Sequence, residues 1–421
     1  MSTAFKKADI LLPKDTDMSK WAVVACDQYT SQPDYWRETE RIVGGARSAL
    51  GLILPEVYLE DEDAEERISK IHENMENYLK ADVFTEYKDS LIYIRRTQSD
   101  GKIREGIVGA IDLEQYDYRK GSKSQVRATE ATVVERIPPR IKVRKGAPIE
   151  LPHIMILIDN PEKTVIEPLA EKTDGMKKLY DFTLMQGGGE IKGWLLDDKS
   201  ADQALAALDR LADLDAFNKK YGLDENSPLV FAMGDGNHSL ATAKEYYEQL
   251  KAENPGKDMS GHPARYALAE IVNLHSPALE FEAIHRIVTG VDKDKLMDAM
   301  TAELGLCENE ISGQSITAVE YGKEKKLYIH KPASKLTVGS LQNFLDGYIK
   351  ENGGKVDYIH GKDVVARLSM SDDSIGFLLP DMGKEELFPT VICDGALPRK
   401  TFSMGHAEDK RFYVEARKIT E

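Results

Sequence analysis

The segment that most constrains the fold is an apolar run that stops at a glycine-containing loop and continues as a helix. Residues 228–233 read PLVFAM, which is typical of a short buried strand. Residues 240–253 read LATAKEYYEQLKAE, a run rich in strong helix formers that Asn254, Pro255 and Gly256 terminate. Between them, residues 234–239 read GDGNHS and predict a tight loop. This order places the N-terminus of a helix directly after a strand.

Such a loop is suited to hold an anion, and phosphate is the first candidate. The first N–H groups of a helix lack intrahelical partners and lie at the positive end of the helix dipole. Gly234 and Gly236 permit tight turning and close approach of a ligand to the backbone. His238 could donate to a phosphate oxygen or carry a proton, and Asp235 could orient a hydroxyl or hold a metal. The alternative is an ordinary capped helix, because Asp, Asn, Ser and Gly are common at caps and turns.

The loop differs from the two common phosphate-binding motifs. No GK[ST] follows it, so it is not a Walker loop, and its glycines do not follow the GxGxxG spacing. Its two remaining polar residues, Asn237 and Ser239, join Gly234 and Gly236 as candidate ligand-binding residues.

The chain is long enough for more than one domain. Its 421 residues suggest two or three domains, and 41% hydrophobic with 30% charged residues is a globular composition. The pattern changes near residue 290, beyond which helical or mixed segments alternate with short strands. We therefore expect a main domain over residues 1–290, which carries the loop, and a C-terminal region over residues 291–421.

Charge, cysteine content and hydropathy argue against several classes of protein. A formal net charge of −16 repels a phosphate backbone, so we expect no nucleic-acid partner, although a local basic patch could serve a small anion. The three cysteines form no CxxC pair and the nine histidines show no HExxH spacing, so we predict neither a disulfide framework nor a structural zinc site. Neither a signal peptide nor a membrane-spanning run is found, which predicts a cytoplasmic protein without a membrane partner.

One basic segment interrupts this acidic background. Residues 119–145 contain nine Lys or Arg and only two Glu, and two consecutive prolines rule out a single long helix. Arg127, Arg136 and Arg140 could clamp a phosphate through bidentate hydrogen bonds. Glu130 lies among these arginines and would be an ionised carboxylate, able to take a proton from a hydroxyl or to bind a cation. A solvated basic hairpin is the alternative interpretation.

Two short motifs later in the chain offer similar chemistry. His285 and Arg286 follow an apolar run, and they could be ligand-binding residues or a surface pair at the end of a strand. Arg399, Lys400 and Thr401 lie on a predicted turn that offers two cations and a hydroxyl. A charged loop in the tail is the alternative for this turn.

The order and spacing of these motifs resemble the family known as domain of unknown function 1015. Members carry a strand that ends in a motif similar to ADGHHRYETA, and this chain reads MGDGNHSLATAKEY from residue 233. An earlier HExT-like segment followed by basic residues corresponds to residues 129–132 with the arginines that follow. A later THR-like motif corresponds to residues 284–286, and a PPKSTFFYPK-like motif corresponds to residues 397–403.

The loop departs from the family pattern at two positions. Asn237 replaces the first His of the pattern, and Ser239 replaces its Arg, which removes a cation from the loop. The loop motif is also similar to one in the ParB/sulfiredoxin-like superfamily, which includes the free serine kinases. The resemblance implies an α+β fold, in which a mixed sheet is flanked by helices around a ParB/sulfiredoxin-like core. It also implies a smaller C-terminal α/β region that completes the site.

The resemblance implies phosphoryl transfer on a small hydroxyl metabolite, with nucleotide-dependent conversion of serine and phosphoserine as the best candidate. The ligand would be small and anionic or phosphorylated, and ATP or ADP with Mg²⁺ would be the cofactor. In that reaction His238 contacts the phosphate, Asp235 orients the substrate or a metal, and Glu130 activates the hydroxyl. A phosphatase acting on the same ester and a non-catalytic nucleotide-binding regulatory protein remain open alternatives.

Overall fold

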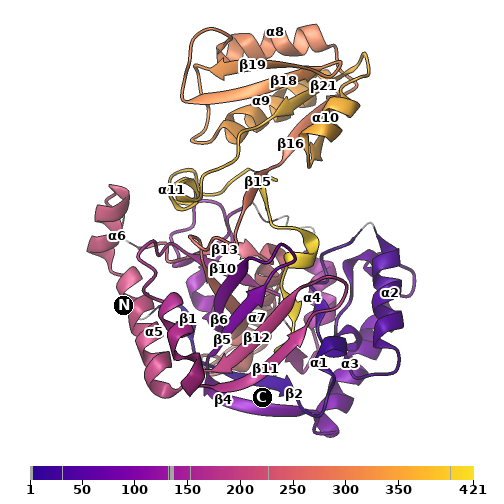
Figure 1. Ribbon diagram of the computed structural model, residues 1–421, viewed down its shortest axis with the longest axis vertical. Coiled ribbons are helices and arrows are strands. Elements are labelled where there is room, and N and C mark those ends of the chain that lie inside the picture. The colour runs from indigo at the N-terminus through magenta and orange to yellow at the C-terminus, as the bar shows by residue number, and fades with distance from the viewer. Residues whose placement is uncertain are drawn as a thin grey trace. The chain divides into compact units, whose positions relative to one another are not determined.

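Two compact units make up the computed structural model, which Figure 1 shows and which describes residues 3–30, 32–130, 132, 137–151, 153–225, 227–398 and 400–421. The first unit comprises residues 1–279 together with residues 405–421, and the second comprises residues 280–404. These limits differ from the expected division at residue 290, chiefly because the last residues of the chain return to the first unit.

A ten-stranded sheet forms the centre of the first unit, and β1 (Phe5–Lys6) pairs with β6 beside the main path. It contains parallel and antiparallel pairs, which confirms the expected α+β class with a mixed sheet. In sheet order the other strands are β11 (Lys177–Thr183), β12 (Glu190–Leu195), β5 (Ile92–Thr97), β6 (Ile103–Asp112), β14 (Tyr266–Asn273), β10 (Met155–Ile158), β13 (Phe231–Asp235), β8 (Val126–Arg127) and β7 (Tyr116–Asp117).

The strand directions bring several strand ends to one edge of this sheet. β10 pairs antiparallel with β13 and parallel with β14, and β13 runs parallel to β8. The C-terminal ends of β8 and β13 therefore meet the N-terminal end of β10. All four residues of β10 are buried, as is typical of a strand in the middle of a covered sheet.

In Figure 1, α5 lies to the left of the sheet of the first unit, and α2 and α3 lie to its right. α4 packs against α7. The helices are α1 (Met18–Trp21), α2 (Pro33–Val43), α3 (Ala64–Lys80), α4 (Ile137–Arg144), α5 (Asp198–Leu211), α6 (Leu214–Tyr221) and α7 (Asn237–Glu253).

Three local features differ from the sequence pattern. The amphipathic run over residues 201–221 forms two helices, because the Asp213 side chain accepts the Ala216 N–H at 2.8 Å and starts α6 as a new helix. Residues Glu167–Gly175 form a 3₁₀ helix in place of an α-helix, and β11 follows directly. The two consecutive prolines of the basic segment lie in the first turn of α4, where a missing N–H is tolerated.

The last residues of the chain complete the first unit through short strand pairs. β23 (Phe412–Tyr413) pairs with β3 (Val23–Val24), and β24 (Arg417–Lys418) pairs with β9 (Ile149–Glu150). Another two-stranded sheet joins β2 (Ala8–Pro13) to β4 (Phe84–Ser90). The C-terminal segment thus contacts elements from near the start and from the middle of the chain.

Arg411 brings this C-terminal segment into a buried ionic cluster. Its Nε donates to Glu270 Oε2 at 3.0 Å and its Nη2 to Glu415 Oε2 at 2.8 Å. Arg104 Nε lies 3.4 Å from the other oxygen of Glu270. The side chains of Arg104, Glu270 and Arg411 are at most 3% exposed. Burial raises the pKa of Glu270, but the two guanidinium groups outweigh it and hold that pKa below its ordinary value.

The second unit has its own antiparallel six-stranded sheet, in the order β17, β19, β18, β21, β16, β20. These strands are β17 (Leu306–Cys307), β19 (Lys323–Ile329), β18 (Gln314–Glu320), β21 (Ser374–Leu378), β16 (His285–Thr289) and β20 (Lys355–Ile359). The unit also contains a separate pair, β15 (Phe281–Ala283) and β22 (Phe402–Met404), and the helices α8 (Lys293–Leu304), α9 (Thr337–Asn352), α10 (Lys362–Leu368) and α11 (Lys384–Asp394).

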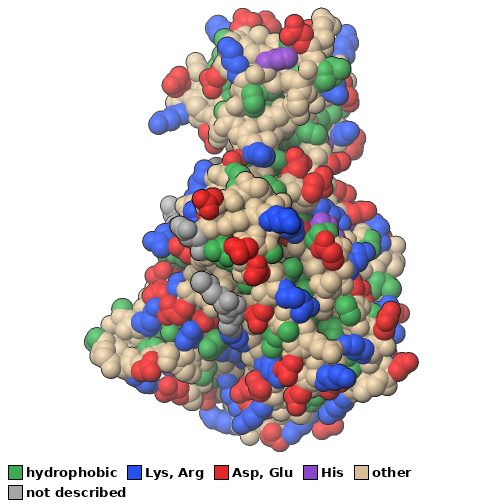
Figure 2. Space-filling view, turned by 90° about the vertical axis from the view of Figure 1, so that its left-hand side faces the viewer, with side chains coloured by type: hydrophobic (Ala, Val, Ile, Leu, Met, Phe, Trp, Pro, Cys, Tyr) green, Lys and Arg blue, Asp and Glu red, His purple; other side chains and the backbone are tan. Residues whose placement is uncertain are grey.

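Charges of both signs are intermixed on the face of the molecule that Figure 2 shows. Exposed pairs such as Lys70–Glu73 and Lys325–Glu308 are typical of this surface chemistry, and each contributes at most about 1 kcal/mol. Within the described ranges, every helix is too short or too polar to cross a membrane.

Candidate functional site

The GDGNHS segment contains less loop than the sequence predicts. Gly234 and Asp235 are the last residues of β13, and α7 begins at Asn237. Ile156 of β10 pairs with Met233, but its neighbour Met155 pairs with Asp235. Gly234 is therefore the extra residue of a β-bulge in β13. Gly236 alone makes the turn, with φ of 79° in the left-handed region.

The N-terminus of α7 carries no side-chain cap. Gly236 occupies the cap position, and the first intrahelical bond runs from Leu240 N to Gly236 O at 3.0 Å. The buried Oδ1 of Asn237 has no hydrogen-bond partner among the described residues. Because α7 is 17 residues long, its dipole and its first N–H groups favour an anion at this end.

Replacing Gly236 with alanine is expected to lower the free energy of unfolding by roughly 1–3 kcal/mol, from left-handed strain and a close contact. A Cβ atom there would lie 3.2 Å from Ile154 Cα. Gly222→Ala is the matched control, because Gly222 is also left-handed but its Cβ would meet nothing within 4 Å. Urea denaturation should show the larger loss for Gly236→Ala, and equal losses would contradict the contact with Ile154.

His153, just before β10, connects several segments of the first unit. Its Nε2 lies 3.3 Å from Asp27 Oδ2 and 3.4 Å from Ser239 Oγ in α7. Its Nδ1 lies 2.7 Å from the hydroxyl oxygen of Tyr413, which also accepts the Cys26 backbone N–H at 3.0 Å. The His153 side chain is 3% exposed and that of Asp27 is 27% exposed. The imidazole is therefore buried, whereas its carboxylate partner still reaches solvent.

The Asp27–His153 pair is ionised near neutral pH. Burial alone would raise the pKa of Asp27, but the His153 charge and its hydrogen bond outweigh burial and hold that pKa well below its ordinary value. Burial alone would lower the pKa of His153, but the Asp27 carboxylate and its hydrogen bond raise it well above its ordinary value. The site therefore contains an imidazolium, both of whose nitrogens donate hydrogen bonds.

This pair predicts a pH window for its contribution to stability. The lowered pKa of Asp27 contributes stability above pH 3.8 that is lost as pH falls towards that pKa. The raised pKa of His153 contributes stability that is complete below pH 6.5 and is lost as pH rises through that pKa. Both contributions are complete between these values, so the Tm difference between wild type and His153→Gln should be largest there and shrink at alkaline pH.

An NMR titration of the His153 ring provides the direct measurement. In the wild type the imidazole should titrate above 6.5, and in Asp27→Asn its pKa should fall because the opposite charge is gone. A wild-type imidazole that titrates at or below 6.5 would contradict the ion pair.

Asp27, His153 and Ser239 do not have the geometry of a Ser-His-Asp hydrolase triad. In such a triad the carboxylate binds one imidazole nitrogen and the serine binds the other. Here both Asp27 and Ser239 contact Nε2, while Nδ1 contacts Tyr413. Ser239 is thus placed as a hydrogen-bonding hydroxyl at the start of α7, and the His153 ring does not contact it in the way that a triad base contacts its serine.

Lys410 brings a cation to the same place. Its Nζ lies 3.6 Å from Asp235 Oδ2, and both side chains are about 15% exposed. Asp235 Oδ1 accepts the Gly236 N–H at 3.0 Å, whereas Oδ2 has no hydrogen-bond partner among the described residues. The charge of Lys410 also helps to lower the pKa of Asp27, after the larger effects of His153 and of hydrogen bonding. Lys410 therefore acts on both carboxylates.

A cavity of about 140 Å³ lies against this cluster. Its polar wall consists of Cys26, His153, Ser239, Thr242 and Tyr413. Two ion pairs, Glu56–Arg140 and Glu150–Arg144, also reach it. The remaining lining is apolar, from Leu52, Ile53, Leu54, Leu59, Met75, Val143, Ala147, Ile149, Leu151 and Ile154. An apolar cavity with a few convergent polar groups is typical of a small-molecule site.

Of the residues predicted from the basic segment, Glu130 lies beside this edge, whereas the Arg127 guanidinium points away from it. Thr129 Oγ1 donates to Met233 O at 2.8 Å, which holds the chain at Glu130 next to the end of β13. The Arg127 guanidinium donates to backbone carbonyls, including Ser227 O at 3.3 Å, which precedes β13 at its opposite end. The Arg127 guanidinium therefore holds backbone of the first unit at the far end of β13.

The other cations of the basic segment are largely neutralised by carboxylates. Arg140 lines the cavity, but its Nε donates to Glu56 Oε1 at 2.9 Å. The same holds for Arg119 with Asp117, Lys123 with Glu225, Lys142 with Glu65, Arg144 with Glu150 and Lys145 with Glu253. Arg136 and Arg399, which the sequence also singles out, lie outside the described residues.

The later motifs come together within the second unit. Arg286 Nη1 donates to Lys400 O at 2.9 Å, and its Nε donates to Gln342 Oε1 at 2.9 Å. The Arg286 side chain is completely buried, and His285 and Thr401 are nearly so. These contacts tie β16 to the turn at residues 400–401, so the residues have a structural role in this unit.

Sequence motifs single out none of four residues that the structure adds to the site, namely Asp27, His153, Lys410 and Tyr413. Asp27 follows a buried apolar segment and His153 lies just before another, so their positions at the ends of apolar runs are the signal that could have found them. Lys410 and Tyr413 are brought to the site by the pairing of β23 with β3, and no local sequence pattern predicts that pairing.

The fold and site together define an α+β protein with a largely apolar cavity that includes Ser239 and Thr242 of α7 in its wall. The chain belongs to the family described as "Protein of unknown function (DUF1015)", whose model matches residues 8–348. This match confirms the resemblance seen in the motifs. No curated protein matches the sequence.

Several solved structures are similar at low identity. A conserved hypothetical protein from Pyrococcus furiosus is 11% identical, with 71% of this chain and 90% of that chain covered and a TM-score of 0.35. C-terminally truncated SbnI from Staphylococcus aureus is 10% identical, with 71% and 82% covered and a TM-score of 0.36. Free serine kinase in complex with AMP is 12% identical, with 74% and 91% covered and a TM-score of 0.38. No residue correspondence follows at this level of similarity.

Proposed function

We propose that this protein transfers a phosphoryl group between a nucleotide and the hydroxyl of a small metabolite. The observation that carries the proposal is the uncapped N-terminus of α7, which adjoins the imidazolium of His153 and the wall of the cavity. Catalysis of phosphoryl transfer depends mainly on positioning and charge neutralisation. A helix N-terminus with two nearby cations, His153 and Lys410, supplies that neutralisation.

Each residue of the cluster has a role in this proposal. The first N–H groups of α7 and the Ser239 hydroxyl bind the transferred phosphoryl group, and His238 contacts it from the second position of the helix. His153 and Lys410 offset its negative charge. Glu130, beside the end of β13, accepts the proton of the acceptor hydroxyl.

The proposed transfer needs no reactant other than the nucleotide and the acceptor hydroxyl. The acceptor oxygen forms a bond to phosphorus while the bond from phosphorus to the bridging oxygen of the nucleotide breaks. The nucleotide leaves with that electron pair, as ADP from ATP or as AMP from ADP, and the hydroxyl proton passes to Glu130.

The carboxylates of the site fit a magnesium ion that accompanies the nucleotide. Mg²⁺ is usually held by one or two carboxylates together with phosphate oxygens and water. Asp235 Oδ2 is a buried carboxylate oxygen without a hydrogen-bond partner among the described residues, so Asp235 is the residue that would hold the ion. When bound, Mg²⁺ would neutralise charge on the phosphates.

Serine is the first acceptor to test, because the loop motif is similar to that of the free serine kinases. The full chain is incubated with Mg²⁺, serine and either ATP or ADP, and phosphoserine is measured by ³¹P NMR. Phosphoserine formed only when nucleotide is present supports the proposal. In a second incubation, the chain is given phosphoserine without nucleotide. Release of phosphate there supports the phosphatase instead.

A thermal-shift screen of nucleotides and phosphorylated metabolites accompanies the product analysis. A ligand at a hundredfold excess over its Kd stabilises the protein by about 2.7 kcal/mol, which is readily measured. Tight nucleotide binding without product from any acceptor would favour a regulatory protein. The absence of both ligand stabilisation and product would overturn the proposal.

A further inference from the structure

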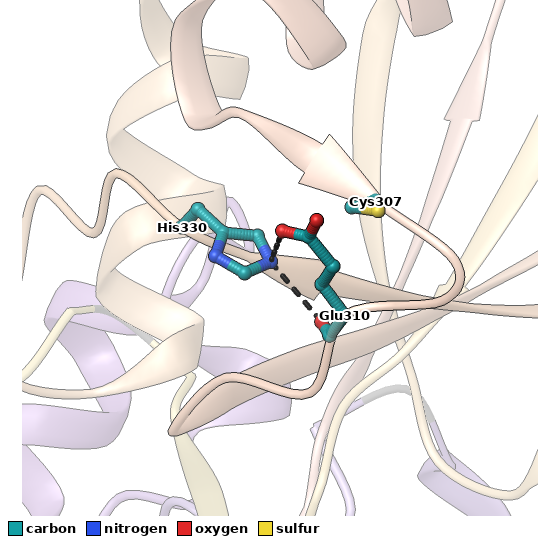
Figure 3. Close-up of side chains that lie close together, drawn as sticks. All are labelled: Cys307, Glu310 and His330. Carbon is teal, nitrogen blue, oxygen red and sulfur yellow. Dashed lines mark hydrogen bonds and ion pairs between the residues drawn. The ribbon is translucent and has the colours of Figure 1, made fainter.

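Three side chains of ligand type lie close together at one edge of the sheet in the second unit (Figure 3). Cys307 ends β17, Glu310 lies in the loop after it, and His330 follows the last residue of β19. Cys307 pairs with Tyr328, and His330 lies two residues beyond Tyr328 along the same chain. Because residues two apart in an extended chain share a face, the register places Cys307 and His330 on one face.

The backbone holds these residues close before any ion binds. One potential ligand atom from each of Cys307, Glu310 and His330 lies within 4.8 Å of the other two. The His330 N–H donates to Leu304 O at 3.2 Å, at the end of α8. His330 Nε2 lies 3.1 Å from the Glu310 carbonyl oxygen and 4.0 Å from its Oε2. The imidazole thus already contacts the loop that carries the carboxylate.

We propose that Cys307, Glu310 and His330 form a site for a divalent transition-metal ion, with Zn²⁺ as the best-fitting ion. A thiolate and an imidazole select zinc-type ions, whereas Mg²⁺ and Ca²⁺ take oxygen ligands. The thiolate and the carboxylate together balance the charge of the ion. The thiol is free to bind, because Cys307 is in no disulfide.

The ligand separation is compatible with tetrahedral coordination after small side-chain movements. Zinc–ligand bonds of roughly 2.0–2.3 Å imply about 3.3–3.8 Å between ligand atoms. The ligand atoms are now at most 4.8 Å apart, and rotations of the side chains that move these atoms by about 1 Å would bring them into that range. Glu310 and His330 are exposed, so such rotation is unhindered and the fourth position is open to water.

The site cannot be predicted from the sequence, because the spacing of its ligands along the chain does not match a known zinc motif. Cys307 and Glu310 are three residues apart, but His330 reaches them only across the β18–β19 hairpin. All three belong to the second unit, so the site is separate from the cavity of the first unit and does not depend on the proposed phosphoryl transfer.

Cobalt titration of the full chain tests the proposal. After treatment with a chelator, stoichiometric Co²⁺ should produce a thiolate-to-cobalt charge-transfer band and the visible bands of tetrahedral cobalt, and Zn²⁺ should remove both. Cys307→Ser should abolish the charge-transfer band. Cys393→Ser is the matched control, since Cys393 is an exposed free cysteine in α11 and its loss should leave the spectrum unchanged.

Zinc affinity, measured by competition with a chromophoric chelator, tests the other two ligands. Glu310→Gln and His330→Ala should each weaken binding by more than about tenfold, because even the loss of an outer-shell partner has an effect of that size. Glu308→Gln is the control from the same loop and should leave the affinity unchanged. Absence of a thiolate band in the wild type, or its persistence in Cys307→Ser, would overturn the proposal.

Discussion

Replacing Arg411 with methionine is expected to lower the free energy of unfolding by roughly 3–5 kcal/mol. The substitution keeps most of the side-chain volume but removes the charge that Glu270 and Glu415 share in the core. Glu270 would retain Arg104 at 3.4 Å and the weaker effect of the Arg96 charge, and Glu415 would lose the guanidinium of Arg411. A buried carboxylate without compensation is costly because the interior solvates it poorly.

Arg67→Met is the matched control for this measurement. Arg67 pairs with Asp63 on the surface of α3, where the two side chains are 37% and 48% exposed. Its loss should therefore lower stability by no more than about 1 kcal/mol. Both variants are compared by urea denaturation, and a loss for Arg411→Met as small as that for Arg67→Met would contradict a stabilising cluster. Adding Glu270→Gln to Arg411→Met should cause less than the sum of the single losses, because the two residues interact directly.

Replacing His238 with alanine is expected to reduce turnover at least about a hundredfold, provided the phosphoryl-transfer proposal holds. His238 is the second residue of α7, at the end where the proposed phosphoryl group binds. Alanine is a strong helix former, and the bond from Thr242 Oγ1 to the His238 carbonyl oxygen does not need the imidazole. The substitution should therefore leave the helix intact, with an unchanged Tm, while turnover falls.

His406→Ala is the control for His238→Ala. His406 is exposed and precedes a short 3₁₀ helix, Ala407–Asp409, without capping it through its side chain. Its removal should leave turnover unchanged. Steady-state kinetics with the nucleotide and acceptor that yield product provide the comparison, and near-normal turnover of His238→Ala would remove that residue from the mechanism.

The sequence predicts those parts of the fold whose signals are local. The apolar alternation on both sides of the turn at residues 99–101 predicts the β5–β6 hairpin, and the structure confirms it. Helical spacing predicts α3 and α7 within a few residues. The pattern fails over residues 201–221, because an apolar stripe continues across the break that the cap at Asp213 creates. The spacing of apolar residues alone cannot distinguish one long helix from two consecutive helices.

The candidate site shows the same division between local and distant signals. The location of the GDGNHS turn is readable from a strand followed by a helix, and the helix begins there. The partners of that turn are not readable, because His153 depends on the β10–β13 pairing and Lys410 on a segment far along the chain. An arginine such as Arg127 is well suited to bind phosphate, but here its guanidinium donates hydrogen bonds to backbone carbonyls. Residue type therefore predicts chemistry only after the fold has assigned a direction to the side chain.

The return of residues 405–421 to the first unit affects the order in which the protein can fold on the ribosome. When residue 279 has emerged, β3 and β9 still lack the strands that pair with them, and Glu270 lacks Arg411. Residues 280–404 must be translated first, which takes on the order of ten seconds. The second unit can complete its own sheet during that interval. The first unit closes only after residues 405–421 have been translated, so a ribosome that stops before them releases a chain without Lys410 and Tyr413.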